Sequence, residues 1–245
     1  IESMEGFKEG RIENLTPEVY TTGITRIFWG LFKKVVIVQW LIAEQLMTPY
    51  QGLLDQVLAD PTGIAFPKLA TCLVLCLLYA YVDLSAYTDI AIGLGNCMGR
   101  NICENFSWPL FRRNIGEFWR CYHMSLSGWC QRHVFTPVLM AGRNTPLAII
   151  AAFMTMGLWH HLNLNWATWA AHHSLGVIWI YYISQLTAEK VPTLADGGKL
   201  HKALTPLAVA LTVLYVAGGI SVVFISDMNT AIEVYLRFFS LGLLS

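Results

Sequence analysis

Two adjacent histidines, His160 and His161, lie inside the longest uncharged stretch of the chain. No Asp, Glu, Lys or Arg occurs between Arg143 and Glu189, and this gap is about twice the roughly 20 residues that one membrane-spanning helix needs. An ionisable side chain at bilayer depth is costly, and it usually marks a working site. The two imidazoles are therefore the first candidates for chemistry.

Three kinds of chemistry suit histidines buried in a membrane. A di-iron centre needs ligands three residues apart on one helix face, whereas adjacent histidines point about 100° apart and no carboxylate accompanies them, so we expect no metal site. A transporter relay would pass protons between buried His and Asp side chains, but the chain lacks paired broken helices in two halves. The third is group transfer, in which a neutral imidazole takes the proton of an acceptor hydroxyl.

A second candidate imidazole, His123, lies in the segment 115–129, which we predict to be one amphipathic helix at the headgroup boundary because aromatic residues recur there at helical spacing. Trp119 lies four residues before His123 and shares its face. His123 therefore faces inward at the membrane rim, or it is a structural histidine bonded to backbone.

The composition indicates what kind of elements hold these side chains. Hydrophobic residues make up 55% of the chain and charged residues 13%, the mean hydropathy is +0.50, and a soluble domain has about 25% charged residues. We therefore expect an all-α, multi-pass membrane protein. The formal net charge of +0 gives no argument for nucleic acid, and the six cysteines lack the CxxC spacing of a zinc site.

The hydrophobic pattern predicts five apolar helices and a short amphipathic one at the end. They are expected at residues 18–47, 65–82, 146–160, 166–185, 204–225 and 229–244. Thr16 as N-cap with Pro17 in the first turn marks the start of the first helix, and the lysines at 33 and 34 indicate that it is tilted, broken or interfacial. The second helix continues into residues 83–93, where Asp83 and Asp89 predict a polar seam between helices.

Basic residues dominate the segment 96–143, which contains six arginines and two glutamates. Short loops rich in Lys and Arg stay in the cytoplasm, so we place this segment there. Three of its arginines, Arg112, Arg113 and Arg120, either steer an anionic carrier towards an entrance or serve only as anchors on the positive side.

Four runs of residues follow one another along the chain. They are Asp83-Leu-Ser-Ala-Tyr-Thr-Asp-Ile-Ala-Ile-Gly93, Glu104-Asn-Phe-Ser-Trp-Pro109, Glu117-Phe-Trp-Arg-Cys-Tyr-His-Met-Ser-Leu-Ser-Gly-Trp129 and Gly157-Leu-Trp-His160. Together they resemble the membrane-bound O-acyltransferase family, in its bacterial alginate O-acetyltransferase-like branch. The resemblance implies a helical membrane bundle with interfacial or re-entrant helices around a tunnel. Residues 1–245 would then be a single membrane domain that lacks the N-terminal helices of the complete fold.

The resemblance also implies roles for individual residues. It makes His160 the catalytic residue and His123 the second active-site residue, and it adds His173 as a further histidine of the site and a candidate for binding substrate. Trp119, Arg120, Asp83 and Asn105 lie within the runs and are candidates for binding substrate. His161 stands where the family usually has Gly, and it either packs or lines the cavity.

The reaction implied is acyl transfer, with acetyl as the expected group. The donor would be a cytoplasmic thioester, either acetyl-CoA or an acyl carrier protein, with no bound cofactor. The acceptor would be an extracytoplasmic polysaccharide served by a periplasmic acyltransferase partner, and the protein would be a multi-pass protein of the bacterial inner membrane. D-alanyl transfer to teichoic acid is one alternative, and a non-catalytic transporter or scaffold of a polysaccharide export complex is another.

Overall fold

The computed structural model describes residues 15–47, 64–190 and 199–241. These residues are helical or irregular, with one isolated bridge between Phe106 and Tyr122 and no strand, as expected of an all-α protein. They fall into two compact units, the first made of Ile1–Gln51 and Leu78–Asn105 and the second of Gly52–Leu77 and Phe106–Ser245. A single membrane domain with a tunnel stays a prediction.

The first unit begins with α2, Pro17–Phe32. Its start is as predicted, because the Thr16 hydroxyl oxygen accepts a hydrogen bond from the Val19 N–H at 3.4 Å and Pro17 occupies the first turn. At Lys33 the α-helix passes into a π-helix, η1, Lys33–Met47. The irregularity expected around the two lysines is thus a change of helix type rather than a gap in the chain.

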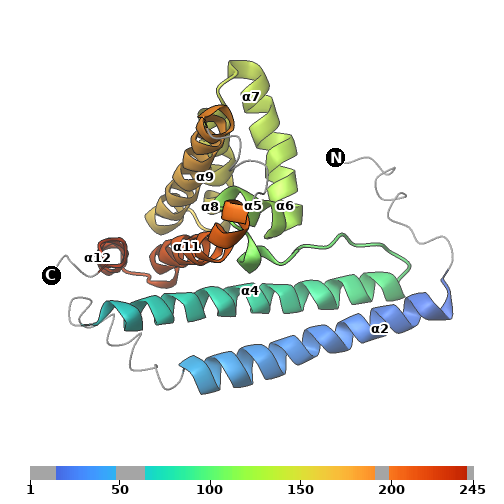
Figure 1. Cartoon of the computed structure of the whole chain (residues 1–245). Coiled ribbons are helices and arrows are strands. Elements are labelled where there is room, and N and C mark those ends of the chain that lie inside the picture. The colour runs from blue at the N-terminus through green and yellow to red at the C-terminus, as the bar shows by residue number, and fades with distance from the viewer. Residues whose placement is uncertain (1–14, 48–63, 191–198, 242–245) are drawn as a thin grey trace. The chain divides into compact units, whose positions relative to one another are not determined.

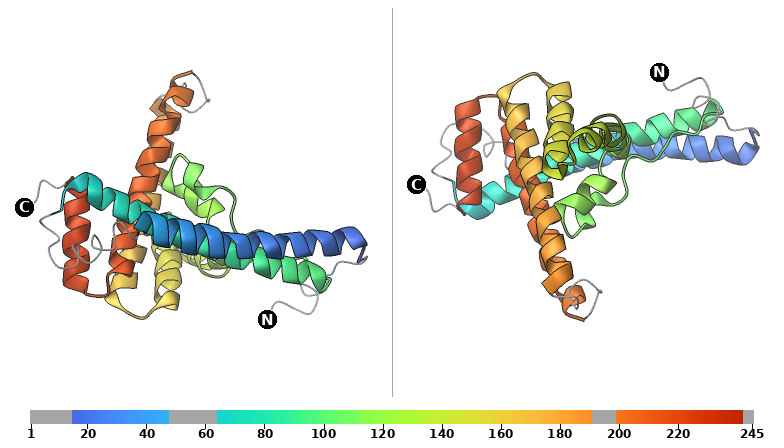
Figure 2. Two further views of the ribbon diagram at one scale, coloured as in Figure 1. Left: turned by 90° about the horizontal axis from the view of Figure 1, so that it is seen from below. Right: turned by 90° about the horizontal axis from the view of Figure 1, so that it is seen from above.

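The partner of α2 is α4, Phe66–Cys97, which joins the predicted apolar helix and the polar segment after it into one helix. The part of α4 within the first unit runs beside α2, as the views in Figures 1 and 2 agree. Two glycines permit this: a Cβ on Gly23 would lie 2.8 Å from the Gly93 carbonyl oxygen, and one on Gly93 would lie 2.5 Å from that of Gly23. Small residues of this kind let membrane helices approach closely.

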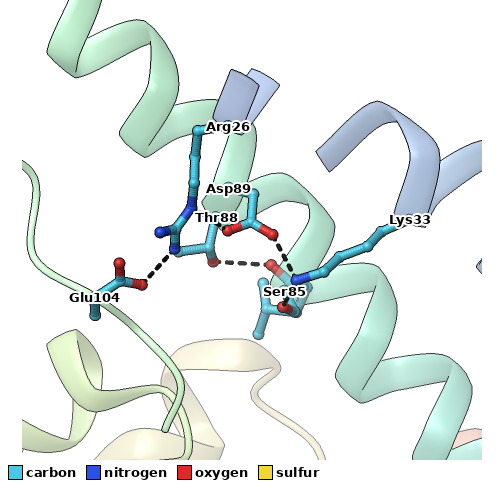
Figure 3. A network of polar contacts seen from close by, with 7 residues as sticks. Arg26, Lys33, Ser85, Thr88, Asp89 and Glu104 are labelled. Atoms are coloured by element: carbon cyan, nitrogen blue, oxygen red, sulfur yellow. Dashed lines mark hydrogen bonds and ion pairs between the residues drawn. The ribbon is translucent and has the colours of Figure 1, made fainter. Parts of the chain in front are cut away.

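The polar seam predicted on α4 holds this pair of helices together (Figure 3). The Asp89 carboxylate, 5% exposed, accepts hydrogen bonds from Arg26 Nε at 2.6 Å and from Lys33 Nζ at 2.5 Å. Lys33 also donates to the Ser85 hydroxyl at 3.0 Å, and Arg26 pairs with Glu104 at 2.5 Å. Each buried charge in the seam therefore has a partner of opposite sign, which offsets its desolvation.

The second unit contains the remaining described helices, and α8 and α9 pack along each other within it, with α11 against α9 and α12 against α11. The helices are α5 (Ile115–Cys121), α6 (Met124–Cys130), α7 (Thr136–Gly142), α8 (Thr145–His160), α9 (Leu164–Lys190), α11 (Lys199–Phe224) and α12 (Met228–Phe239). A 3-10 turn, η3 (Pro109–Phe111), precedes α5, and a π-helical turn, η4 (Gln131–Phe135), joins α6 to α7.

The single amphipathic helix predicted over residues 115–129 is wrong. The chain forms α5 and α6 instead, and the break falls at His123, whose φ of 49° and ψ of 52° are left-handed and cannot continue a helix. Just before the break, the Ser107 N–H donates to the Cys121 carbonyl at 2.9 Å and Phe106 forms its bridge with Tyr122. These contacts join residues fourteen and sixteen positions apart, and they occur where a pattern that looks continuous in the sequence is interrupted.

Among the described residues, two helices are long and apolar enough to cross a membrane, Phe66–Cys97 and Lys202–Phe224. The uncharged helix α8 is apolar but has 16 residues. Large apolar side chains such as Leu175 and Trp179 on α9 are exposed, as expected of surfaces that face lipid or further helices. The predicted multi-pass topology with five apolar helices stays a prediction.

Candidate functional site

The uncharged helix α8 carries His160 in its last turn. Asn144 caps the start of the helix, since its side-chain oxygen accepts a hydrogen bond from the Leu147 N–H at 2.9 Å. The helix ends at His160, as the sequence predicts, and the next residue, His161, is extended with φ −155° and ψ 136°. The side chain of His160 is half-buried, whereas His161 is exposed.

The start of α9 brings an indole onto the imidazole of His160. The side-chain oxygen of Asn163 accepts a hydrogen bond from the Trp166 N–H at 3.0 Å and so caps α9. The centroids of the His160 and Trp166 rings are 4.5 Å apart, and their planes are within 21° of parallel. The sequence indicated only a polar turn here, because the amino-acid sequence does not show that the Trp166 ring packs on the His160 ring.

His123 combines two unusual features. Its backbone is left-handed, a conformation that costs a residue with a side chain about 1–3 kcal/mol. Its Nδ1 atom is buried and has no hydrogen-bond partner among the described residues. Burial lowers the pKa of His123, and the nearby charge of His160 lowers it further. Backbone strain and unpaired buried polar atoms are both more frequent at functional sites than elsewhere, so these features are compatible with the predicted role of His123.

His173 lies deeper in the second unit, where it is 1% exposed. The Trp119 indole N–H donates to its Nδ1 at 3.4 Å, and the Trp169 ring lies edge-on at 4.7 Å between centroids. The structure therefore brings together two residues predicted to bind substrate, Trp119 and His173, as one buried pair. Their contacts here are with protein rings.

A continuous series of aromatic contacts connects His123 with His160. Successive ring centroids lie 6.5 Å apart for His123 and Phe106, 5.1 Å for Phe106 and Tyr122, 5.6 Å for Tyr122 and Trp119, 5.5 Å for Trp119 and Trp169, 5.5 Å for Trp169 and Trp166, and 4.5 Å for Trp166 and His160. Both imidazoles are thus set in one aromatic framework, built from α5, α8, α9 and the segment before η3.

A cavity of about 300 Å³ opens beside this framework. It lies among α5, α6, η4, α8 and α9, and its lining includes Trp119, Arg120, Met124, Phe153 and Met156. Arg120 is the one charged side chain of the lining, and Met156 is one turn before His160 on α8. The cavity can therefore hold an apolar group that ends in, or is attached to, an anion.

His172, the neighbour of His173, has both ring nitrogens occupied. Its Nε2 lies 3.1 Å from the Tyr215 carbonyl oxygen and its Nδ1 lies 2.9 Å from the Tyr235 hydroxyl. The Tyr215 hydroxyl donates back to the His172 carbonyl at 2.6 Å. His172 thus connects α9 to α11 and α12, which is a structural role.

Two predicted binding residues belong to the first unit. The Asp83 carboxylate pairs with Lys34 Nζ, and Asn105 lies in the irregular segment after α4. The histidines belong to the second unit, so a shared site with Asp83 and Asn105 stays a prediction. Of the arginines expected to steer a carrier, Arg112 donates to the Ser107 carbonyl at 2.6 Å, and Arg113 lies 3.7 Å from the Glu117 carboxylate.

In the part of the chain that the structure describes, no three His, Cys, Asp or Glu side chains converge as ligands for a metal ion. The site therefore consists of imidazoles, aromatic rings and a cavity with one guanidinium. The cavity meets the aromatic framework at Trp119, and its lining contains no histidine. A neutral imidazole that reaches a bound substrate can exchange a proton with its hydroxyl.

Comparison with known proteins identifies a family whose sequence model matches this chain. The family model described as MBOAT, membrane-bound O-acyltransferase family, matches residues 2–197. A protein named probable alginate O-acetylase from Pseudomonas aeruginosa is 30% identical over 234 residues, which cover 93% of this chain and 40% of that protein.

Two further relatives carry other names. A teichoic acid D-alanyltransferase from Bacillus subtilis is 32% identical over 110 residues, which cover 40% of this chain and 27% of that protein. A peptidoglycan O-acetyltransferase from Helicobacter pylori is 27% identical over 183 residues, covering 72% of this chain and 32% of that protein. The chain thus spans about two fifths, or less, of the length of these relatives.

Proposed function

Because this chain belongs to the membrane-bound O-acyltransferase family, we propose that the protein carrying it transfers an acyl group, acetyl by preference, from a cytoplasmic thioester donor to hydroxyls of an extracytoplasmic polysaccharide. The match to alginate O-acetylases over 93% of the chain supports acetyl as the group and a polysaccharide as the acceptor. The peptidoglycan O-acetyltransferase relative also supports acetyl.

The observation that supports this proposal is that His123 and His160 are linked by one series of aromatic contacts and that His160 affects the pKa of His123. His160 acts as general base: one ring nitrogen takes the proton of the acceptor hydroxyl while the oxygen attacks the carbonyl carbon of the thioester. The C–S bond then breaks, the ester forms, and the departing thiolate takes the proton back from the imidazolium. The base is regenerated, so no bound cofactor is needed.

His123 acts on the oxygen of the same carbonyl. Its low pKa keeps its imidazole neutral at neutral pH, so the ring carries one N–H and one lone pair. The N–H donates to the carbonyl oxygen as negative charge develops in the tetrahedral state. The unpaired buried Nδ1 supports this role, because a bound substrate would supply the missing partner.

The cavity beside the framework receives the donor. Its volume of about 300 Å³ and apolar lining suit the acyl group and the thioester arm. Arg120 holds a phosphate or carboxylate of the carrier, either coenzyme A or an acyl carrier protein. A periplasmic acyltransferase partner receives the acyl group or completes the modification of the polymer. The protein lies in the bacterial inner membrane, which separates the cytoplasmic donor from the extracytoplasmic acceptor.

Substitution of His160 tests the proposal. We expect His160→Ala and His160→Gln, expressed from the complete gene, to lower polymer acylation at least about a hundredfold, because the general base is lost. His133→Ala is the matched control, since His133 is an exposed histidine of η4 outside the framework. Acyl groups released from envelope polysaccharide are measured by mass spectrometry, with the amount of protein in the membrane determined in parallel. Unchanged acylation in either His160 variant rejects the proposal.

The teichoic acid D-alanyltransferase relative supports a second candidate, D-alanyl transfer. The same measurement separates the two, because it identifies the group released from the polymer. A non-catalytic transporter predicts instead that membrane vesicles carry a solute without any acyl donor. For a transporter or a scaffold, polymer acylation in cells stays unchanged in both His160 variants.

A further inference from the structure

We propose that Trp166 is a positioning residue of this site: its indole fixes the plane of the His160 imidazole by stacking on it. The inference rests on the proposed role of His160 as general base. Trp166 lies outside the four sequence runs described above. The proposed stacking also gives a reason for a glycine at position 157, three residues before His160.

Ring packing is what orients His160. In the described part of the chain no hydrogen bond reaches its imidazole, whereas both nitrogens of His172 are bonded and His173 accepts from Trp119. Two indoles contact the His160 ring instead. Trp166 covers its face at 4.5 Å and 21°, and Trp159 meets it edge-on at 4.9 Å and 66°. Trp159 is 67% exposed, so the better-buried partner is Trp166.

Gly157 is what allows α9 to come this close. A Cβ at Gly157 would lie 2.6 Å from the Trp166 carbonyl oxygen and 3.0 Å from the Cβ of Ala170. No side chain larger than hydrogen fits there without moving α9. Gly157 precedes His160 by three residues, which places both on the same side of α8. The glycine therefore admits the backbone of Trp166, and its indole reaches the imidazole.

Two asparagines hold the backbone around Trp166. Asn163 caps α9 through the Trp166 N–H. Asn165, 8% exposed, donates from its side-chain amide to the carbonyl oxygens of Val222 at 2.8 Å and Ile225 at 2.9 Å, at the end of α11. These bonds satisfy carbonyls that the helix end leaves unpaired. They also fix where α9 starts, and with it the position of the indole.

The stack has a direct consequence for the reaction. An imidazole turns about its second side-chain torsion over a broad range when nothing holds it. A general base works only when its lone pair points at the proton it removes, and small misplacements cost up to about a hundredfold in rate. The indole face also favours the imidazolium that forms after proton transfer. Loss of the stack therefore slows the chemical step and leaves donor binding intact.

The test compares Trp166→Leu with Trp166→Phe in the full-length membrane protein. We expect Trp166→Leu to lower kcat by about tenfold to a hundredfold and to keep KM for the thioester donor within about twofold, because an interaction that orients the base is lost. Trp166→Phe keeps an aromatic face, so it retains most of kcat. Trp179→Leu is the matched control, as Trp179 is a tryptophan of the same helix, 67% exposed, and not in contact with the framework's imidazoles.

Wild-type kcat in Trp166→Leu overturns the inference, and so does a Trp166→Phe variant as slow as Trp166→Leu. If Trp166→Leu does not accumulate in the membrane, Trp166→Met replaces it, since methionine fills volume without an aromatic face. His160→Gln is assayed beside them. An active His160→Gln refutes the proposed function itself, whereas an inactive His160→Gln with a fast Trp166→Leu refutes only the stacking role.

Discussion

Three imidazoles in the second unit differ in how their nitrogens are used. His172 has partners on both nitrogens and His173 accepts from Trp119, whereas the Nδ1 of His123 is buried without a partner among the described residues. An unpaired buried polar atom costs about 1–3 kcal/mol, and the left-handed backbone of His123 adds to it. Such a cost is expected where a substrate supplies the missing contact, which is the role proposed for His123.

The pH dependence of stability tests the state of His123. Burial lowers its pKa in the folded protein, with a further contribution from nearby His160, whereas the unfolded chain keeps a value of about 6.5. As the pH falls, the unfolded state binds the proton first. The stability that neutral His123 contributes is thus complete above about pH 6.5 and is lost below it, towards the lower folded pKa.

His123→Gln removes this titration and leaves the buried histidines His172 and His173 in place. We therefore expect wild type to lose more thermal stability than the variant between about pH 7.5 and pH 5.5. Thermal unfolding of the detergent-solubilised protein at a series of pH values measures the difference. Parallel curves for the two proteins would contradict a depressed pKa at this position.

At the scale of elements, glycines set how closely helices pair. Gly23 and Gly93 let α2 and α4 approach in the first unit, and Gly157 does the same for α8 and α9 in the second. The consequences differ: the first contact aligns ion pairs such as Arg26 with Asp89, whereas the second brings an indole onto an imidazole. Close approach of helices at glycines thus supports the ion pairs of the first unit and the candidate site of the second unit.

A methyl group at Gly157 tests the second contact. The Cβ of Gly157→Ala would lie 2.6 Å from the Trp166 carbonyl oxygen, so α8 and α9 must separate and we expect a loss of about 1–3 kcal/mol in stability, as for other overpacked sites. Gly142→Ala is the control, because a Cβ there meets nothing within 4 Å. Thermal unfolding of both variants decides the matter. Equal stability for Gly157→Ala and wild type would contradict the close approach.

At the scale of the whole molecule, the chain spans about two fifths of its alginate O-acetylase relatives, and the part described forms two units. The histidine framework lies entirely in the second unit, whereas Asp83 and Asn105 belong to the first. The orientation of the complete protein in the membrane is predicted from the distribution of its arginines.

The native cysteines offer a test of sidedness. Arginines dominate the segment 96–143, so we expect exposed Cys103 to face the cytoplasm. A membrane-impermeant thiol reagent should label it in inside-out vesicles and leave it unlabelled in right-side-out vesicles. Cys103→Ser identifies the signal, and the buried Cys72 and Cys76 should stay unlabelled on both sides. Labelling of Cys103 from the outside would reverse the predicted orientation.

The sequence by itself determined the features that depend on local pattern. Apolar runs and capping residues such as Thr16 placed the helices, and the run Gly157-Leu-Trp-His160 together with the position of His123 indicated the family and the two candidate imidazoles. Helix formation and capping depend on residues close together in the chain, so they can be predicted from the amino-acid sequence.

Only the tertiary structure decided what depends on distant contacts. The break at His123 coincides with backbone contacts of residues 106 and 107 with residues 121 and 122. The helical spacing of aromatic residues in the sequence carries no information about such contacts. The same holds for Trp166, which in the sequence is one tryptophan among nine. It stacks on His160 because Gly157 admits its backbone and Asn165 anchors it to α11, and contacts between separate helices are set by packing in three dimensions.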